Sequence, residues 1–201
     1  SSDLLVDYFT DNYKLQKQVD FLEENDCYVA CFHNVINLSE STGAKSLFLP
    51  LVFPDEVNAI DVITKRWFLP IHSVLMRREL IAFPDWYAEV MNDDFVINLS
   101  VVMHGPYYYM PDIMAIYRRH DANTSIQYKD QLLINNQLYQ IFEKFSDIYP
   151  LEYKDVFAER LKQLHEAIVF YEKDAKYPWL KWFRVKTYSR FVKKQLRKWV
   201  C

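Results

Sequence analysis

Hydrophobic and polar positions recur along this 201-residue chain with more than one period. Over residues 11–25 the apolar positions Leu15, Val19 and Leu22 recur at helical spacing. This pattern predicts an amphipathic helix whose apolar stripe faces the core. Residues 27–36 are instead continuously apolar, β-branched and aromatic, which predicts a buried strand.

The same criteria predict an α/β body followed by helices. The remaining predicted elements are a loop over 39–54, a helix over 55–65, a strand over 71–77, a helical turn over 84–89, a helix over 93–104, and long helices over 130–149 and 152–175. Pro111 interrupts residues 107–117, and because proline cannot donate to a sheet ladder, we expect two short strands or an edge strand there. The expected divisions are an α/β part over 1–125, a helical hairpin over 126–175 and a tail over 176–201.

The charge is divided unevenly between the body and this tail. Residues 176–201 carry nine Lys and Arg and no acid, whereas the first 175 residues carry 15 bases against 27 acids. Aromatic residues lie between the bases of the tail, which is typical of a helix on an anionic membrane surface. The equally weighted alternative is a C-terminal helix packed on the acidic body. Nucleic acid is not an expected partner, because the body would repel phosphates.

Composition excludes several classes of site. The chain has only two glycines, so the glycine-rich phosphate loops of Walker and Rossmann proteins are absent. Three cysteines without partners at zinc-site spacing predict no structural zinc and a reducing, cytoplasmic compartment. Aromatic residues make up 17% of the chain, and we attribute them mainly to a well-filled core.

Three short segments contain residues that could act in catalysis, diphosphate binding or metal binding. Asp93 and Asp94 are either the capping acids of a helix or, for one of them, a general base at a cleft. Residues 117–120, with two arginines and a histidine, can bind a diphosphate or place His120 on a metal. Asp7 offers the carboxylate oxygens that Mg²⁺ or Mn²⁺ prefers. Each segment also has an ordinary structural explanation as capping or solvated residues.

The order of these segments resembles glycosyltransferase family 2. Residues 7–11 (DYFTD) and 14–23 (KLQKQVDFLE) are similar to the stretch at and after the metal-binding acidic motif of that family. Residues 31–35 (CFHNV) and 73–78 (SVLMRR) resemble two core strands that follow it. Asp94 aligns best with the catalytic-base acid, and residues 117–120 (YRRH) match the closing Y-R-x-H motif.

This resemblance implies an incomplete GT-A fold, a nucleotide-sugar donor and a Mg²⁺ or Mn²⁺ ion. It implies inverting transfer of a sugar to the hydroxyl of a glycan or lipid-linked acceptor, in cell-surface polysaccharide or glycan assembly. The roles it assigns are catalysis for Asp94 and Asp93, diphosphate binding for His120, Arg118 and Arg119, the acceptor side for Ser73, and metal binding for Asp7 and His120.

The chain departs from the family pattern before Asp7. Residues 4–6 are Leu-Leu-Val, so only the last acid of the metal motif is present, and apolar side chains cannot coordinate a hard cation. The nucleotide-binding half of the fold is also missing from this sequence. We therefore expect weak donor binding by a truncated chain, a degenerate copy or a natural half that needs a partner.

The alternative function is a non-catalytic binding or scaffolding module. In this interpretation the basic tail recruits the acidic body to a membrane or a partner. The expected location is cytoplasmic, peripheral at the inner face of the membrane. A sheet that lacks its neighbouring strands also predicts self-association through the exposed edge.

Overall fold

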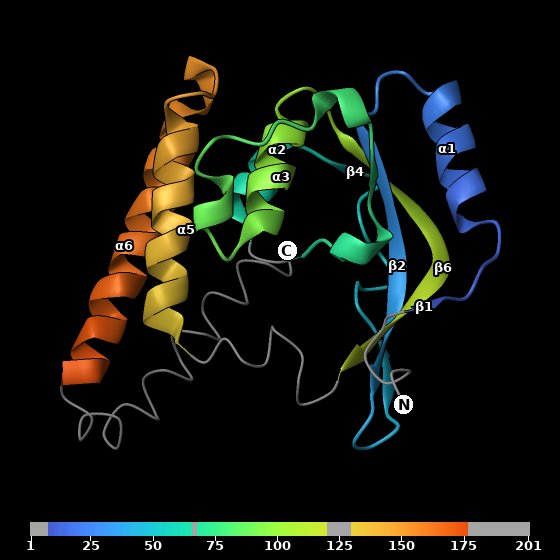
Figure 1. The fold of residues 1–201 in the computed structure, drawn as a ribbon, viewed down its shortest axis with the longest axis horizontal. Coiled ribbons are helices and arrows are strands. Elements are labelled where there is room, and N and C mark those ends of the chain that lie inside the picture. Colours follow the sequence, from blue (N-terminus) through green and yellow to red (C-terminus); the bar gives the residue numbers. More distant parts are fainter. Residues whose placement is uncertain (1–7, 66–67, 120–129, 177–201) are drawn as a thin grey trace.

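A computed structural model describes residues 8–65, 68–119 and 130–176, which form one mixed sheet with helices on both faces (Figure 1). The strands are β1 (Tyr8–Phe9), β2 (Ala30–Ser39), β3 (Lys45–Leu47), β4 (Glu56–Val57), β5 (Leu75–Met76) and β6 (Tyr107–Arg119). The α-helices are α1 (Lys14–Glu24), α2 (Ala59–Thr64), α3 (Asp93–Val102), α5 (Gln131–Ser146) and α6 (Lys154–Lys176). The 3-10 turns are η1 (Ile71–Ser73), η2 (Arg78–Leu80), η3 (Tyr87–Glu89) and η4 (Leu151–Tyr153). The predicted mixed α/β body followed by helices is confirmed.

The two long strands β2 and β6 form the centre of the sheet. They run parallel, and their register begins at Ala30 opposite Tyr107 and ends at Ser39 opposite Arg119. The order of neighbours is β1-β6-β2-β3, and β4 and β5 also pair with β6 and β2 respectively. The strands at the two ends of this order have only two and three residues, so each offers few backbone groups to a second chain. Self-association remains a prediction.

Strand β6 continues through Pro111, so the prediction of two short strands or an edge is wrong. His33 of β2 lies opposite Met110, but the next residue, Asn34, lies opposite Ile113. Pro111 and Asp112 therefore occupy a bulge in which the proline needs no partner for its missing N–H group. The bulge allows one strand to stay inside the sheet between β1 and β2.

The helical layer and one face of the sheet share a single apolar core. The buried residues of this cluster include Phe32, Val62, Phe95, Leu99, Leu138, Phe142 and Phe157. The helices α5 and α6 lie side by side as predicted and pack against α2 and α3 (Figure 1). The core therefore extends across residue 125 into the hairpin. In the described ranges, none of the helices is long and apolar enough to cross a bilayer.

Helix α1 covers the opposite face of the sheet with an unexpected set of side chains. The residues it buries are Lys14, Gln18 and Leu22, while Leu15 is 53% exposed and Val19 38% exposed. The predicted apolar stripe is therefore wrong except at Leu22. The helix is rotated so that a polar face meets the sheet.

Shorter elements differ from their predictions for local reasons. The helix expected from residue 55 begins at Ala59, because Asn58 and Asp61 form a reciprocal capping box at 3.1 Å in each direction. The strand expected over 71–77 is instead the turn η1 followed by the two-residue β5. The expected loop over 39–54 contains β3, which pairs with β2.

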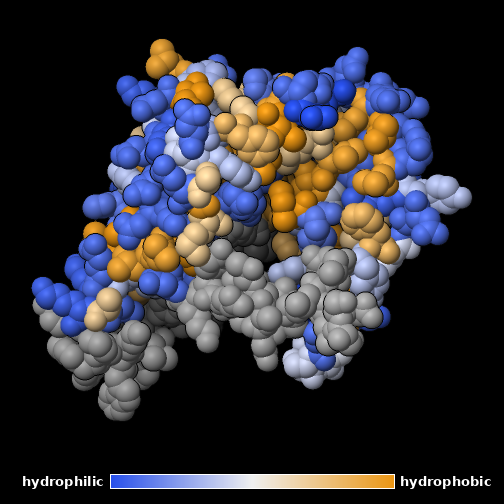
Figure 2. Space-filling view, in the orientation of Figure 1, coloured by the Kyte–Doolittle hydropathy of each residue, from blue (hydrophilic) through white to orange (hydrophobic). Residues whose placement is uncertain are grey.

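Figure 2 shows how hydropathy is distributed over one face of the molecule. Hydrophilic side chains cover most of the helical side, and apolar side chains gather toward the middle. A hollow lies between the helical part and the sheet on this face.

Candidate functional site

Asp93 and Asp94 form the first turn of α3. The Oδ1 atom of Asp93 accepts from the Asp94 amide at 3.0 Å, and Oδ1 of Asp94 accepts from the Phe95 amide at 3.0 Å. The Asp93 carboxylate thereby gives the Asp94 amide a partner, and the Asp94 carboxylate shares the Phe95 amide with the carbonyl of Asn92 at 3.1 Å. The positive end of the helix dipole favours both charges. Asp93 and Asp94 are thus the capping acids of a helix, which is the structural role that the sequence suggested.

The loop in front of α3 is fixed by side chains from two elements. Tyr87 of η3 donates its hydroxyl to Oδ2 of Asp93 at 3.3 Å. Burial, with the Asp93 charge beside it, raises the pKa of Tyr87, so this hydroxyl stays protonated as a donor at neutral pH. Gln137 of α5 accepts from the amide of Met91 at 3.4 Å and from the side chain of Asn92 at 3.2 Å. These contacts hold the two acids in place.

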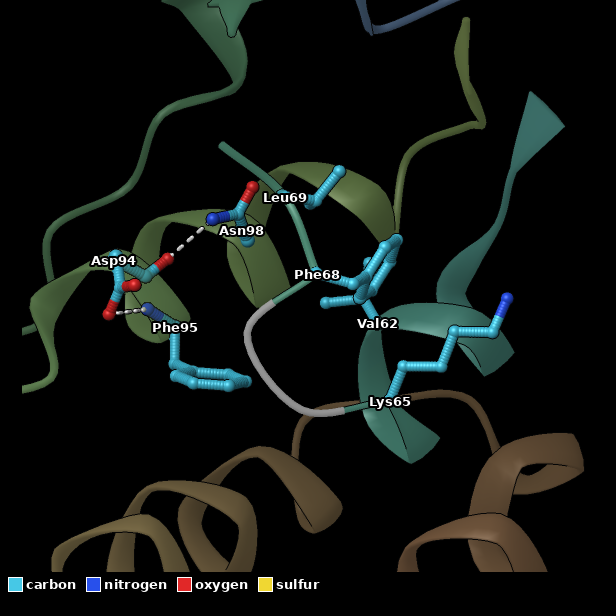
Figure 3. Close-up of a pocket in the computed structure, with 7 residues that line it drawn as sticks. All are labelled: Val62, Lys65, Phe68, Leu69, Asp94, Phe95 and Asn98. Carbon is cyan, nitrogen blue, oxygen red and sulfur yellow. Dashed lines mark hydrogen bonds between the residues drawn. The ribbon is translucent and has the colours of Figure 1, made fainter. Parts of the chain in front are cut away.

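A small cavity lies behind Asp94 (Figure 3). Its lining residues are Val62, Lys65, Phe68, Leu69, Asp94, Phe95 and Asn98. Its volume is about 20 Å³, enough for one water molecule. The Lys65 ammonium pairs with Asp61 at 2.6 Å and points away from Asp94. A sugar would therefore have to approach the half-buried Asp94 from outside this cavity.

Residues 117–119 of the closing motif lie at the end of β6, beside Tyr8 of the first motif. Tyr8 pairs with Ile116, the residue before Tyr117, although the two segments are far apart in the sequence. The ring of Tyr117 stacks on His72 with centroids 5.3 Å apart. Arg118 forms an ion pair with Glu40, and Arg119 is exposed. The first and the closing segments are thus neighbours in the sheet, and His72, which contacts Tyr117, directly precedes the segment 73–78.

The remaining candidates differ in their surroundings. Asp7 and His120, the candidate metal ligands, lie outside the described residues. Ser73 is fully buried. Its hydroxyl donates to the carbonyl of Pro70 at 2.7 Å and accepts from the His33 amide at 3.4 Å. This hydroxyl is therefore occupied inside the protein, and its assignment to the acceptor side remains a prediction.

The candidates form two groups on different elements. Asp93 and Asp94 stand at the start of α3, with neighbours from η3 and α2, whereas Arg118 and Arg119 stand at the end of β6. Within the described ranges, no group of three or more His, Cys, Asp or Glu side chains is arranged to hold a metal ion. The described residues therefore give no fitted site for the Mg²⁺ or Mn²⁺ that the resemblance implies.

A buried polar layer between α1 and the sheet was missed at the sequence level. Gln18 donates to the carbonyl of Ser73 at 2.8 Å and lies 3.4 Å from the carbonyl of Cys31. Lys14 donates to Gln18 at 2.8 Å, and burial lowers the pKa of its ammonium. Burial also raises the pKa of the Cys31 thiol to about 11, so this cysteine is not a thiolate nucleophile at neutral pH.

His33 is the most perturbed member of this layer. Burial lowers the pKa of His33 to about 4, so the imidazole is neutral at physiological pH. Its Nδ1 lies 2.7 Å from the carbonyl of Asn34, which requires Nδ1 to carry the proton. The unprotonated Nε2 is buried without a hydrogen-bond partner among the described residues. The only sequence signal for the layer was the spacing of Lys14, Gln18 and Leu22, four residues apart.

This chain is similar in sequence to three mycobacterial proteins. No protein-family model matches it. Uncharacterized proteins of Mycobacterium bovis and of two Mycobacterium tuberculosis strains are each 34% identical to it over 114 residues. The aligned segment is 57% of this chain but only 32% of each relative, so the chain spans about a third of their length.

Proposed function

We propose that this chain is the acceptor-side part of a GT-A glycosyltransferase of family 2, which transfers a sugar from a nucleotide-sugar to an acceptor hydroxyl with inversion. The observation that supports it best is the meeting of the first motif with the closing motif. Tyr8 of the first motif pairs with Ile116, the residue before Tyr117, so the first and closing motifs are neighbours in space although they lie far apart in the sequence.

The proposed chemistry uses a carboxylate as general base. Asp94 is half-buried at the start of α3, and its position is maintained by the Phe95 amide and by the Asn98 side chain, which donates to its carbonyl at 2.7 Å. Asp94 takes the proton of the acceptor hydroxyl while that oxygen bonds to the anomeric carbon. The bond from this carbon to the diphosphate oxygen breaks, and the nucleoside diphosphate leaves. Arg118 and Arg119 are the proposed cations on that diphosphate.

The test is sugar transfer by Asp94→Asn in a complete chain, meaning one that also carries a nucleotide-binding half. Asparagine still accepts from the Phe95 amide, so the variant keeps its helix cap but cannot take a proton. We expect transfer to fall by at least about a hundredfold. The matched control, Asp155→Asn, changes an exposed acid in the first turn of another helix, α6, and should keep most activity. Unchanged transfer by Asp94→Asn would overturn the proposed role of this acid.

A non-catalytic module is the second proposal, because Leu4, Leu5 and Val6 replace the acids expected before Asp7. Calorimetric titration of this chain with UDP and with GDP, each with Mn²⁺, separates the two. Saturable binding that a chelator abolishes contradicts a non-catalytic module. Absence of binding agrees with the weak donor binding expected of this chain alone, and the transfer assay then decides. For the tail, equal pelleting with anionic liposomes before and after removal of residues 176–201 would contradict membrane recruitment.

A further inference from the structure

A second, larger groove lies between η3 and α5. Its volume is about 320 Å³, within the range of small-molecule sites, which is roughly 300–1,000 Å³. Its lining residues are Trp86, Glu89, Val90, Gln140, Ile141, Glu143 and Lys144. None of these residues was a candidate from the sequence.

The groove combines an aromatic ring with both kinds of hydrogen-bonding group. Trp86 is half-buried and packs edge-on against the buried Phe145 with ring centroids 6.0 Å apart. This contact restricts the orientation of the indole ring. The Lys144 ammonium lies 4.7 Å from the centre of the Trp86 ring. The flexible lysine stem allows this ammonium to leave the ring face or to donate to a ligand lying on it.

The polar groups around this ring suit a neutral, hydroxyl-rich molecule. Glu89 and Glu143 supply acceptors, Lys144 supplies donors and Gln140 supplies both, and all four side chains are exposed. A saccharide ring presents hydroxyl groups at its rim, each a donor and an acceptor, and apolar C–H groups on its faces. An aromatic surface surrounded by mixed donors and acceptors matches both parts of such a ring.

The groove is built from the same loop that holds the candidate catalytic acids. Trp86 and Glu89 flank Tyr87, whose hydroxyl donates to Asp93 at 3.3 Å. On the other wall, Gln140 lies one helical turn after Gln137, which accepts from Met91 and Asn92 immediately before α3. The groove is therefore built on the same two elements, η3 and α5, that hold the loop before α3.

We propose that the groove between η3 and α5 binds a saccharide unit, with the ring on Trp86 and the hydroxyls on Glu89, Gln140 and Glu143. On the proposed transferase function, which this role presupposes, the unit belongs to the acceptor glycan and orients it toward Asp94. Saccharide binding by itself does not require transfer activity, so the two proposals can fail separately.

The test is NMR titration of the chain with a panel of probes: galactose, mannose, N-acetylglucosamine and the β-linked disaccharides of glucose and of N-acetylglucosamine. We expect at least one member to shift the indole N–H signal of Trp86, assigned by its loss in Trp86→Phe. The double variant Gln140→Ala/Glu143→Ala changes only exposed side chains, so it should stay folded and bind that member at least about tenfold more weakly. The matched control is Asn136→Ala, an exposed position on the same helix but outside the groove.

The outcomes separate the groove from the catalytic proposal. Binding that persists in Asp94→Asn but is lost in the double variant supports the groove, whatever the transfer assay gives. A panel in which no member moves the Trp86 signal overturns the groove, even when the complete chain transfers sugar. Equal weakening by Asn136→Ala and by the double variant also overturns it, because the effect would then not be local to the groove.

Discussion

The two faces of the sheet are covered by chemically different layers. On one face lie α2, α3, α5 and α6 (Figure 1). They enclose an aromatic and aliphatic core in which Phe142 packs between Phe95 and Phe157. On the other face, α1 presents Lys14 and Gln18 to the sheet and leaves Leu15 and Val19 exposed. The first face is held by burial of apolar area. The second combines apolar contacts, in which Leu22 is buried and Phe21 stacks on Tyr108 at 4.3 Å, with hydrogen bonds among buried polar groups.

This difference predicts different responses to mutation. An apolar core loses stability in proportion to the volume removed. A buried polar layer loses stability when one partner is removed and the other stays buried, and it responds to pH because its groups titrate. Four predictions test the contrast, beginning with the largest effect.

Phe142→Ala should cost about 3–5 kcal/mol of the free energy of unfolding, because it opens a cavity among packed rings. Phe142 is fully buried, with ring centroids 5.8 Å from Phe95 and 6.2 Å from Phe157. Urea denaturation followed by circular dichroism measures the loss. A loss below about 1 kcal/mol would mean that this face is not the main source of stability.

Acidification should destabilise the α1 face through His33. The pKa of His33 is about 4 in the folded protein, against an ordinary value of 6.5. Between pH 4 and 6.5 the imidazole is therefore protonated in the unfolded chain but neutral in the folded protein. Stability from this group is therefore complete above about pH 6.5 and falls by about 2–3 kcal/mol as the pH drops toward 4. Urea titrations at several pH values should show a flatter profile for His33→Gln than for the wild type. An exposed control, His165→Gln, should keep the wild-type profile, and identical profiles for all three chains would refute the prediction.

Gln18→Ala should cost about 1–3 kcal/mol, since the buried carbonyl of Ser73 loses its donor at 2.8 Å. The control is Gln16→Ala on the exposed side of the same helix, where the amide bonds to exposed Asp20. Thermal and urea unfolding of both variants give the comparison. Equal effects at the two positions would show that the polar layer adds nothing to stability.

The smallest effect is expected on the outer side of α1. Leu15→Gln should change the free energy of unfolding by no more than about 0.5 kcal/mol and Val19→Gln by no more than about 1 kcal/mol, because Leu15 is 53% exposed and Val19 38% exposed. Urea denaturation measures this directly. A loss above about 2 kcal/mol at either position would indicate that the apolar stripe is the buried one after all, and the contrast between the faces would fail.

The sequence predicted the elements whose pattern is strong and local. The long helices at α5 and α6, the start of α3 at Asp93, and the buried strand at β2 all follow from periodicity or capping residues. It failed at β6 because proline normally ends a ladder, and only the register with β2 provides the bulge that accommodates Pro111.

In the candidate site, too, the sequence predicted the features set by neighbouring residues and missed those set by distant segments. Asp93 and Asp94 were found because two acids before an apolar run are a local signal of a helix start. The groove at Trp86 was not found, because its walls come from η3 and α5, which are far apart in the sequence and share no motif. Ser73 was assigned to an acceptor side by resemblance, whereas its hydroxyl is directed to Pro70 inside the protein.

The sequence by itself determined the α/β class, the order of the main elements and the acidic first turn of α3. These depend on side-chain periodicity and on backbone groups a few residues apart, so nearby residues suffice to specify them. Only the tertiary structure decided that Tyr8 lies beside Ile116, that α1 buries Lys14 and Gln18, and that a groove opens between η3 and α5. Those features depend on contacts between distant segments, where the free energy of pairing and burial across the whole fold outweighs the preference of any single segment.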